Sequence, residues 1–388
     1  MEFELSFKPV EHRSEDFSPS QLGRKIMVYT PGNFPNLSEA DLILFSVDEY
    51  RGVNQKEIIE PTGSFDFFRQ ELYRLYEGSN RLRIADLGQL LIGQQLSDTY
   101  QLLSDVLVEC EQRGLFCLVI GGGQDLTLSQ YQSCMQLGKL VNMVSIDSKL
   151  DLGLDEGNTP ANSYFSELIK KTPNVLFNFT NIGYQSYLNA ISSIKLLNDM
   201  YFEAFRLGEI RQNLEEVEPL LRNADLVTLD MNAIRMSDNP SNVESSPNGF
   251  YSEEICQIMR YAGISGRLRS LGIYHYNKKL DTRSQSAKLL SQMIWCFFEG
   301  FFHKMKQFKP TDEDMIKYHV SMRDGEYNTC FYKNKKLEKW WMEIPLINQE
   351  NTSFENYFAP CSYRDYQLAV KGEVPERWLK AFQKMNQL

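Results

Sequence analysis

Short apolar runs that alternate with amphipathic helical stretches are the feature that most restricts how this chain can fold. Each run is rich in Val, Ile, Leu and Phe, and helical patterns such as "TYQLLSDVLVECEQRG" (99–114) lie between the runs. This order is typical of a parallel sheet whose two faces are covered by helices, an α/β fold. We predict eight strands, at residues 40–47, 83–88, 115–121, 141–147, 174–183, 201–208, 224–230 and 268–276.

The sequence changes character near its C-terminal end. A long helix is expected from Ser284 to Phe308, with a wide apolar face that contains "WCFFEGFF" and belongs to the core. After Pro310 the pattern indicates two or three antiparallel strands, of which two are joined by the turn "KNKK" (333–336). A closing helix begins with the proline of "PERWLKAFQKMNQL" (375–388), a favoured first helical residue.

We therefore expect two parts of unequal size. Residues 1–310 form the α/β domain, with about the first 37 residues as a lead-in segment, and residues 311–388 form an α+β appendage packed on it. Neighbouring residues in a strand point to opposite faces, so of Trp340 and Trp341 one is expected to be buried and the other to lie at an interface.

Charge and cysteine usage exclude several classes of protein. The formal net charge is -10 and the longest basic run is "KNKK", so neither nucleic acid nor a membrane surface is an expected partner. No apolar stretch reaches the length of a membrane span, and the N-terminus lacks the basic start of a signal peptide. Seven cysteines without CxxC spacing indicate reduced thiols and a cytoplasmic protein.

Polar residues gather at the ends of three predicted strands, where open parallel sheets bind ligands. In an extended segment residues two apart share a face, so Asp147, Lys149 and Asp151 should point into one space, and so should Asp230 with Asn232. The residues are Gln124 and Asp125 after the glycines 121–123, then Asp147, Lys149 and Asp151, and finally Asp230 and Asn232.

Each of these patterns also has an interpretation that involves no ligand. Gly121–Gly123 fits no nucleotide-binding spacing and favours a tight strand-to-helix turn over a phosphate cradle. Asp125 is expected to cap the helix that follows it. The charged residues of 147–151 could form a solvated ion-pair cluster, and His275, between two tyrosines, is more typical of a partly buried structural histidine than of a catalyst.

Over roughly residues 38–308 the motifs resemble those of the ureohydrolases, the family of arginase, agmatinase and formimidoylglutamase. The resemblance implies a three-layer α/β/α fold with an eight-stranded, mainly parallel sheet and a binuclear manganese site at the strand ends. The family motifs are Gly-Gly-x-His, Asp-Ala-His-x-Asp and Asp-x-Asp, here "GGGQ", "DSKLD" and "DMN". A looser match, "GIYHYN", has His275 where the family has a substrate-holding Glu.

Carried over residue by residue, this resemblance retains only half of the six ligand positions. Asp147, Asp151 and Asp230 are kept, whereas Gln124 and Lys149 stand at histidine positions and Asn232 at an aspartate position. The chain has four histidines, at 12, 275, 303 and 319, so none lies in the interval that supplies the family's histidine ligands.

An ammonium group has no lone pair for a metal, and it repels a cation. At an effective dielectric of 20, two unit charges 4 Å apart interact by roughly 4 kcal/mol. We therefore expect Lys149 to offset Asp147 and Asp151, and no cofactor to be used. The pocket would bind a small polar ligand or a protein partner without catalysis, with homo-oligomers expected from the family resemblance. The alternative is a hydrolase of linear C–N bonds with an atypical or mononuclear Mn²⁺ site held by the three aspartates.

Overall fold

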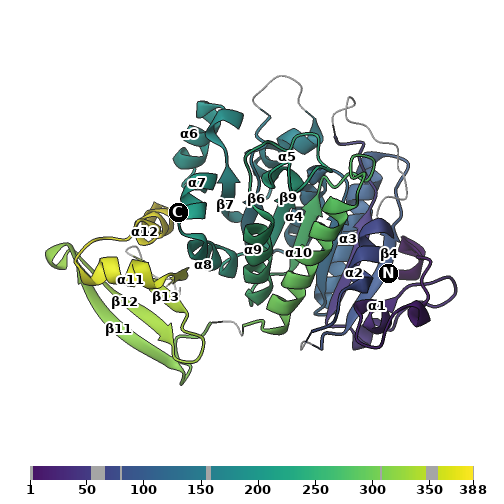
Figure 1. The fold of residues 1–388 in the computed structure, drawn as a ribbon. Coiled ribbons are helices and arrows are strands. Elements are labelled where there is room, and N and C mark those ends of the chain that lie inside the picture. The colour runs from purple at the N-terminus through teal and green to yellow at the C-terminus, as the bar shows by residue number, and fades with distance from the viewer. Residues whose placement is uncertain are drawn as a thin grey trace.

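The computed structural model describes residues 3–53, 66–78, 81–153, 159–305, 308–346 and 357–387. Its centre is a ten-stranded sheet in the order β1-β4-β3-β5-β10-β9-β6-β7-β8, with β2 paired to β4 (Figure 1). The strands are β1 (Phe7–Lys8), β2 (Met27–Val28), β3 (Leu42–Val47), β4 (Ile84–Leu90), β5 (Phe116–Gly121), β6 (Val141–Ile146), β7 (Leu176–Tyr184), β8 (Glu203–Arg206), β9 (Leu226–Asp230) and β10 (Ser270–Tyr274).

All eight predicted strands are confirmed, and they pair in parallel. The remaining two strands, each of two residues, come from the N-terminal segment and both pair with β4, β1 in the antiparallel direction. The central strands β3, β5, β6 and β9 are buried throughout, which is why most of their residues are apolar.

Helices cover both faces of the sheet and complete a three-layer α/β/α arrangement. One core cluster unites α2, α9 and α10 with one face, and two further clusters place α3 and α5 on the other. The helices of this part are α1 (Leu22–Lys25), α2 (Asp66–Arg74), α3 (Leu96–Gln112), α4 (Thr127–Gln136), α5 (Pro160–Ile169), α6 (Ile191–Asp199), α7 (Leu207–Gln212), α8 (Val217–Arg222), α9 (Ser252–Ile264) and α10 (Gln285–Phe302).

Helices α9 and α10 pack unusually closely because each has a glycine at the contact. A Cβ atom added to Gly263 would lie 2.4 Å from the carbonyl oxygen of Phe297, and one added to Gly300 would lie 2.2 Å from that of Arg260. The predicted helix from Ser284 is confirmed, but α10 ends at Phe302, before the predicted end at residue 308.

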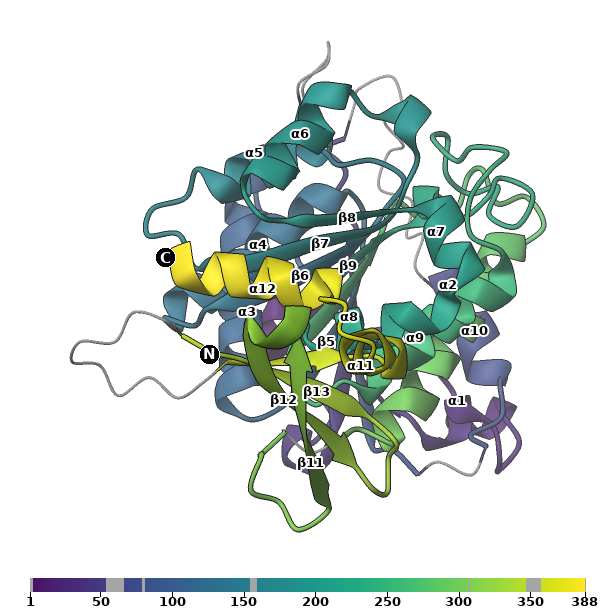
Figure 2. The same ribbon diagram turned by 90° about the vertical axis from the view of Figure 1, so that its left-hand side faces the viewer.

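The C-terminal module consists of a four-stranded antiparallel sheet and two helices, which lie beside the large sheet in Figure 2. The sequence predicts two or three of these strands and one of the helices, and the "KNKK" segment ends the second strand and begins the turn to the third. The elements are β11 (Met315–Met322), β12 (Tyr327–Asn334), β13 (Trp340–Ile344), β14 (Tyr357–Cys361), α11 (Tyr363–Val370) and α12 (Glu376–Gln387).

The two adjacent tryptophans fix this sheet from both sides. Trp340 packs beneath α11, where it stacks on Tyr366. Trp341 points the other way, stacks on Phe308 and lies under the guanidinium of Arg222, which also donates a hydrogen bond of 3.0 Å to the carbonyl oxygen of Trp340. Both rings are buried, and Trp341 joins the module to α8 of the large domain.

Among the described residues, no helix is long and apolar enough to cross a membrane.

Candidate active site

Three buried carboxylates lie near one another where the central strands end. Asp147 directly follows β6, Asp230 ends β9, and Asp151 lies four residues beyond Asp147. Asp147 and Asp230 are 0% and 1% exposed, and Asp151 is 9% exposed. Burial and the charge of Asp230 raise the pKa of Asp147 to about 7, while burial and the charge of Asp147 raise the pKa of Asp151 well above its usual value. Without a cation, Asp147 and Asp151 therefore resist losing their protons.

The predicted extended segment from 147 to 151 is wrong, although its residues do converge. Strand β6 ends at Ile146, and the backbone N–H of Lys149 folds back to donate a 2.8 Å hydrogen bond to Oδ1 of Asp147. Asp151 has a left-handed backbone with φ 45°, which is uncommon for a residue with a side chain. The chain therefore turns here, and the turn brings Asp151 back against Asp147.

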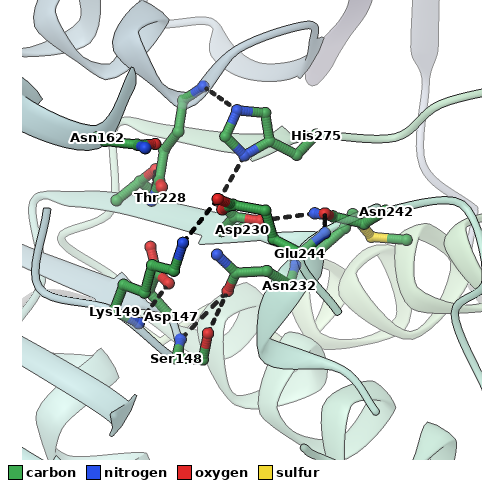
Figure 3. Close-up of polar contacts among 12 residues, drawn as sticks. Asp147, Ser148, Lys149, Asn162, Thr228, Asp230, Asn232, Asn242, Glu244 and His275 are labelled. Carbon is green, nitrogen blue, oxygen red and sulfur yellow. Dashed lines mark hydrogen bonds and ion pairs between the residues drawn. The ribbon is translucent and has the colours of Figure 1, made fainter. Parts of the chain in front are cut away.

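Lys149 pairs with a residue that the sequence did not single out. Its ammonium nitrogen lies 2.6 Å from Oε1 of Glu244, at the edge of the carboxylate group (Figure 3). Burial opposes the charge on Lys149, but Glu244 raises its pKa above the usual value, so it stays a cation at neutral pH. The expectation that Lys149 offsets the charges of Asp147 and Asp151 is met only in part, because its direct partner is Glu244. Asp147 and Asp151 contribute only weaker, longer-range attraction.

The glycine-rich loop that positions Gln124 packs closely against the loop that contains Glu49. A Cβ atom on Gly122 would lie 2.0 Å from the carbonyl oxygen of Glu49, so only glycine fits. The predicted tight turn is confirmed, since β5 leads into a 3-10 helix at Gln124–Leu126. The side-chain nitrogen of Gln124 faces Thr228 at 3.4 Å, while its buried oxygen has no hydrogen-bond partner.

Asp230 connects the carboxylate group to the neighbouring strand. Its Oδ2 lies 2.6 Å from Nδ1 of His275, and its Oδ1 accepts hydrogen bonds from Asn242 and from the backbone of Asn232. The side-chain oxygen of Asn232 accepts from Ser148, at 2.9 Å from the hydroxyl, so Asn232 holds the β6 turn.

His275 has a strained backbone, and its contacts favour two different protonation states of its ring. Its φ is 63°, and its backbone N–H donates to the carbonyl oxygen of Gly122. The backbone N–H of Gln124 approaches Nε2 at 3.3 Å, which favours a neutral ring. Burial also opposes a charge, but Asp230 outweighs it and raises the pKa of His275 to about 9. The 2.6 Å ion pair is the stronger contact, so we assign the charged ring when no cation is bound.

Asp125 does not cap the helix that follows, which corrects the prediction from its position. Helix α4 begins at Thr127 without a side-chain cap. Instead, Asp125 accepts a hydrogen bond of 2.5 Å from the hydroxyl of Tyr100 on α3. Burial raises the pKa of Asp125 to about 6. The residue fastens α3 to the glycine-rich loop and stands outside the carboxylate group.

A loop that sequence reasoning passed over supplies the other wall of the site. The backbone N–H of Glu244 donates to Oδ1 of Asn242, and Asn242 in turn donates to Asp230. A small cavity at this position is lined by both residues together with Tyr50, Asn162, His275 and Asn277. The available signal was the polar run "NPSNVESSPNG" (239–249), which directly follows the Asp-x-Asn strand.

The protein has a three-layer α/β/α fold, and acidic and amide side chains lie at the carboxyl ends of its central strands. These two features are typical of α/β proteins that bind a ligand at the strand ends. The model of the arginase family matches residues 62–299, more than half of the chain. The chain belongs to the arginase family.

Known relatives support this assignment at low identity. The formimidoylglutamase of Photorhabdus laumondii is 22% identical over 279 residues, which cover 69% of this chain and 86% of the relative. That of Klebsiella pneumoniae is 22% identical over 304 residues, or 73% and 88% of the two chains. Among solved structures, Trypanosoma cruzi formiminoglutamase with Mn²⁺ has a TM-score of 0.62 at 19% identity, covering 70% of this chain and 96% of that one. Bacillus subtilis formimidoylglutamase has a TM-score of 0.64 at 14% identity, covering 76% and 95%.

These comparisons correct the prediction about the cofactor and change which of the two predicted functions is better supported. The expectation that no cofactor is used is wrong, because a structure that shares this fold contains Mn²⁺. The similar proteins are named as enzymes, which supports the hydrolase alternative more than a non-catalytic binding protein. The structural similarity, below 25% identity, concerns the fold alone.

Proposed function

We propose that this protein is a metal-dependent hydrolase of linear amidines, of the formimidoylglutamase type, that works with a single divalent cation. One observation carries the proposal. Two buried oxygen atoms, Oδ2 of Asp147 and the side-chain oxygen of Gln124, accept no hydrogen bond from an N–H or hydroxyl donor, and Asp147 lies against the carboxyl group of Asp151. They belong to neighbouring side chains, since Gln124 is close enough to Asp147 to lower its pKa. Buried acceptors without partners are costly, and a cation would satisfy both.

The set of donors fits one hard cation. Carboxylate and amide oxygens are suitable ligands for Mn²⁺ or Mg²⁺, and three aspartates with Gln124 supply them. Within the described ranges, no three His, Cys, Asp or Glu side chains already surround a common point as metal ligands. The amide oxygen therefore has to complete the set, and Asp147, Asp151 and Asp230 have to draw together. A second cation would lack ligands, because Asn232 is engaged with Ser148 and Lys149 is a cation.

The bound cation would act as a Lewis acid and make water a nucleophile at neutral pH. The remaining steps fall to this chain's own side chains. Oε2 of Glu244, which lines the cavity, would accept from an amidinium group while Oε1 stays paired with Lys149. His275, buried beside Asp230, is the group that we assign to protonate the departing amine. The reaction adds water to HN=CH–NHR and gives formamide and the free amine H₂N–R.

A direct assay tests the proposal. Protein loaded with Mn²⁺ and freed of excess metal is given N-formimidoyl-L-glutamate, and formamide and glutamate are quantified by NMR. We expect both products in equal amounts, and no turnover after treatment with a chelator. A folded, Mn²⁺-loaded protein that releases no formamide from this substrate would contradict the proposal.

Lys149→Met should strengthen Mn²⁺ binding. The ammonium group lies at the edge of the cation site and repels a divalent ion, and its removal also frees the charge of Glu244. At an effective dielectric of 20, two unit charges a few ångströms apart interact by roughly 4 kcal/mol. We therefore expect the variant to bind Mn²⁺ about tenfold more tightly, as measured by calorimetry. The matched control is Lys139→Met, whose ammonium makes an equally short 2.6 Å pair with Glu111, remote from the site. Unchanged or weaker binding in Lys149→Met would place the cation elsewhere.

A further inference from the structure

A second cleft lies between the C-terminal module and the large domain, at the opposite end of the strands from the carboxylates. It is bounded by α12 and β14 of the module and by the starts of β6, β7 and β8. Figure 2 shows α12 lying across this part of the large sheet. We call it the junction cleft. It holds about 650 Å³ of empty space, including the solvent at its mouth. At ~3.3 Å per residue, strand β6 separates it from the candidate active site by roughly 16 Å.

Lys384 of α12 places a cation in this cleft without a carboxylate to pair with it. Its ammonium nitrogen donates to Oδ1 of Asn178 at 2.8 Å and lies 4.7 Å from the ring centre of Phe202. Over the described part of the chain, Lys384 forms no ion pair within 4.0 Å, and Asn178 is the protein acceptor that its ammonium group reaches. Burial lowers the pKa of Lys384 to about 8, which agrees with a poorly solvated ammonium group.

The other two cations of the cleft are already neutralised. Arg377 contacts Asp365 at 2.7 Å and Glu216 at 3.4 Å, and Lys380 contacts Glu376 at 2.7 Å. Lys384 is therefore the group that would attract an anion. Lys384 is only partly buried, but its ammonium group is less well hydrated than an exposed one, and an anionic ligand would offset that loss.

An acid stands on the facing strand. Glu203 of β8 accepts a hydrogen bond from Thr180 through Oε2 at 3.1 Å, and its charge acts on Lys384 without a direct ion pair. The side-chain oxygen of Asn142, at the start of β6, is buried without a hydrogen-bond partner. The cleft thus presents a separated cation and anion, together with an unsatisfied amide and aromatic walls that include Phe177 and Tyr357.

We propose that the junction cleft binds a small zwitterion, a free amino acid with an apolar side chain. Its carboxylate would pair with Lys384, its ammonium with Glu203, and its side chain would pack on the aromatic walls. The ligand would touch β6–β8 and α12 at once, and so would hold the C-terminal module against the large domain. This site is independent of the metal and of the activity proposed above.

Calorimetry with three matched probes tests the assignment on the full chain. L-Valine carries both charges, isovalerate lacks the amine, and isobutylamine lacks the carboxylate. We expect L-valine to bind most tightly. Lys384→Met should weaken L-valine binding about tenfold or more, because it removes the charged donor to the ligand's carboxylate. The control Lys380→Met, which removes an ammonium already paired within α12, should change it less than about twofold.

Glu203→Gln separates the amino-acid assignment from plain anion binding. It should weaken L-valine and leave isovalerate unchanged, and it remains informative if Lys384→Met fails to fold. The proposal is overturned if L-valine does not bind at tens of millimolar, or if a folded Lys384→Met variant binds it normally. Equal binding of isovalerate and L-valine, insensitive to Glu203→Gln, would overturn the zwitterion in favour of a simple carboxylate.

Discussion

Asp147→Asn is expected to weaken Mn²⁺ binding by about 100-fold or more and to abolish Mn²⁺-dependent hydrolysis. Asp147 touches both Asp151 and Gln124, and its Oδ2 is one of the two buried oxygens that accept no hydrogen bond from an N–H or hydroxyl donor. Replacing it with an amide removes one negative charge from the centre of the ligand set, where hard cations depend on carboxylates. Calorimetric titration with Mn²⁺ measures the loss.

The variant separates loss of a ligand from loss of the fold. Without metal, the change relieves repulsion among buried carboxylates, so circular dichroism should show a folded protein. Asp125→Asn is the matched control, because Asp125 is equally buried and adjacent to Gln124 but bonds to Tyr100 instead. It should change Mn²⁺ affinity by no more than a few-fold. Equal losses in the two variants would contradict the ligand set proposed here.

Arg69→Met should destabilise the protein by about 3–5 kcal/mol, the cost of removing one partner from a buried ion pair. Arg69 on α2 is 2% exposed and makes two hydrogen bonds, of 2.8 and 3.1 Å, to the carboxylate of Asp86 on β4, which is 0% exposed. It also donates to the carbonyl oxygen of Gly88 at 2.6 Å. With methionine in its place, Asp86 would be a buried charge whose one remaining side-chain donor among the described residues is the hydroxyl of Tyr73.

Denaturant unfolding measures this loss, with Arg74→Met as the control on the exposed face of the same helix. Arg74 is 63% exposed and forms only a surface pair with Glu71, so its replacement should cost less than about 1 kcal/mol. The double variant Arg69→Met, Asp86→Leu should recover part of the stability, since it removes both charges. A loss below about 1 kcal/mol in Arg69→Met would show that the pair does not anchor α2.

The fold could be predicted wherever burial dictated sequence. Strands such as Leu42–Val47 are buried on both faces, so every residue in them is apolar or small. The two-residue strands β1 and β2 are too short to leave such a pattern. Helix α11 was missed as well, since its eight residues lie among aromatic side chains of the module and only two are buried.

Only part of the site could be predicted from the sequence, because some of its contacts depend on a distant loop and on an unusual turn. The strand ends converge because a parallel sheet places them at one edge. Their convergence could therefore be predicted without knowing any contact between side chains. The partner of Lys149, Glu244, lies 95 residues away in an irregular loop, and no local periodicity connects the two. The turn at Asp151 depends on a left-handed backbone that a non-glycine residue rarely adopts, so an extended segment was the natural but wrong expectation.

Metal content tests the central claim most directly. The purified protein is saturated with Mn²⁺, desalted and analysed by mass spectrometry for manganese per chain, with Asp147→Asn treated in parallel. One tightly held manganese in the protein, and none in the variant, is the predicted result, because Asp147, Asp151, Asp230 and Gln124 supply ligands for a single cation. Two manganese ions per chain, or none, would contradict the account.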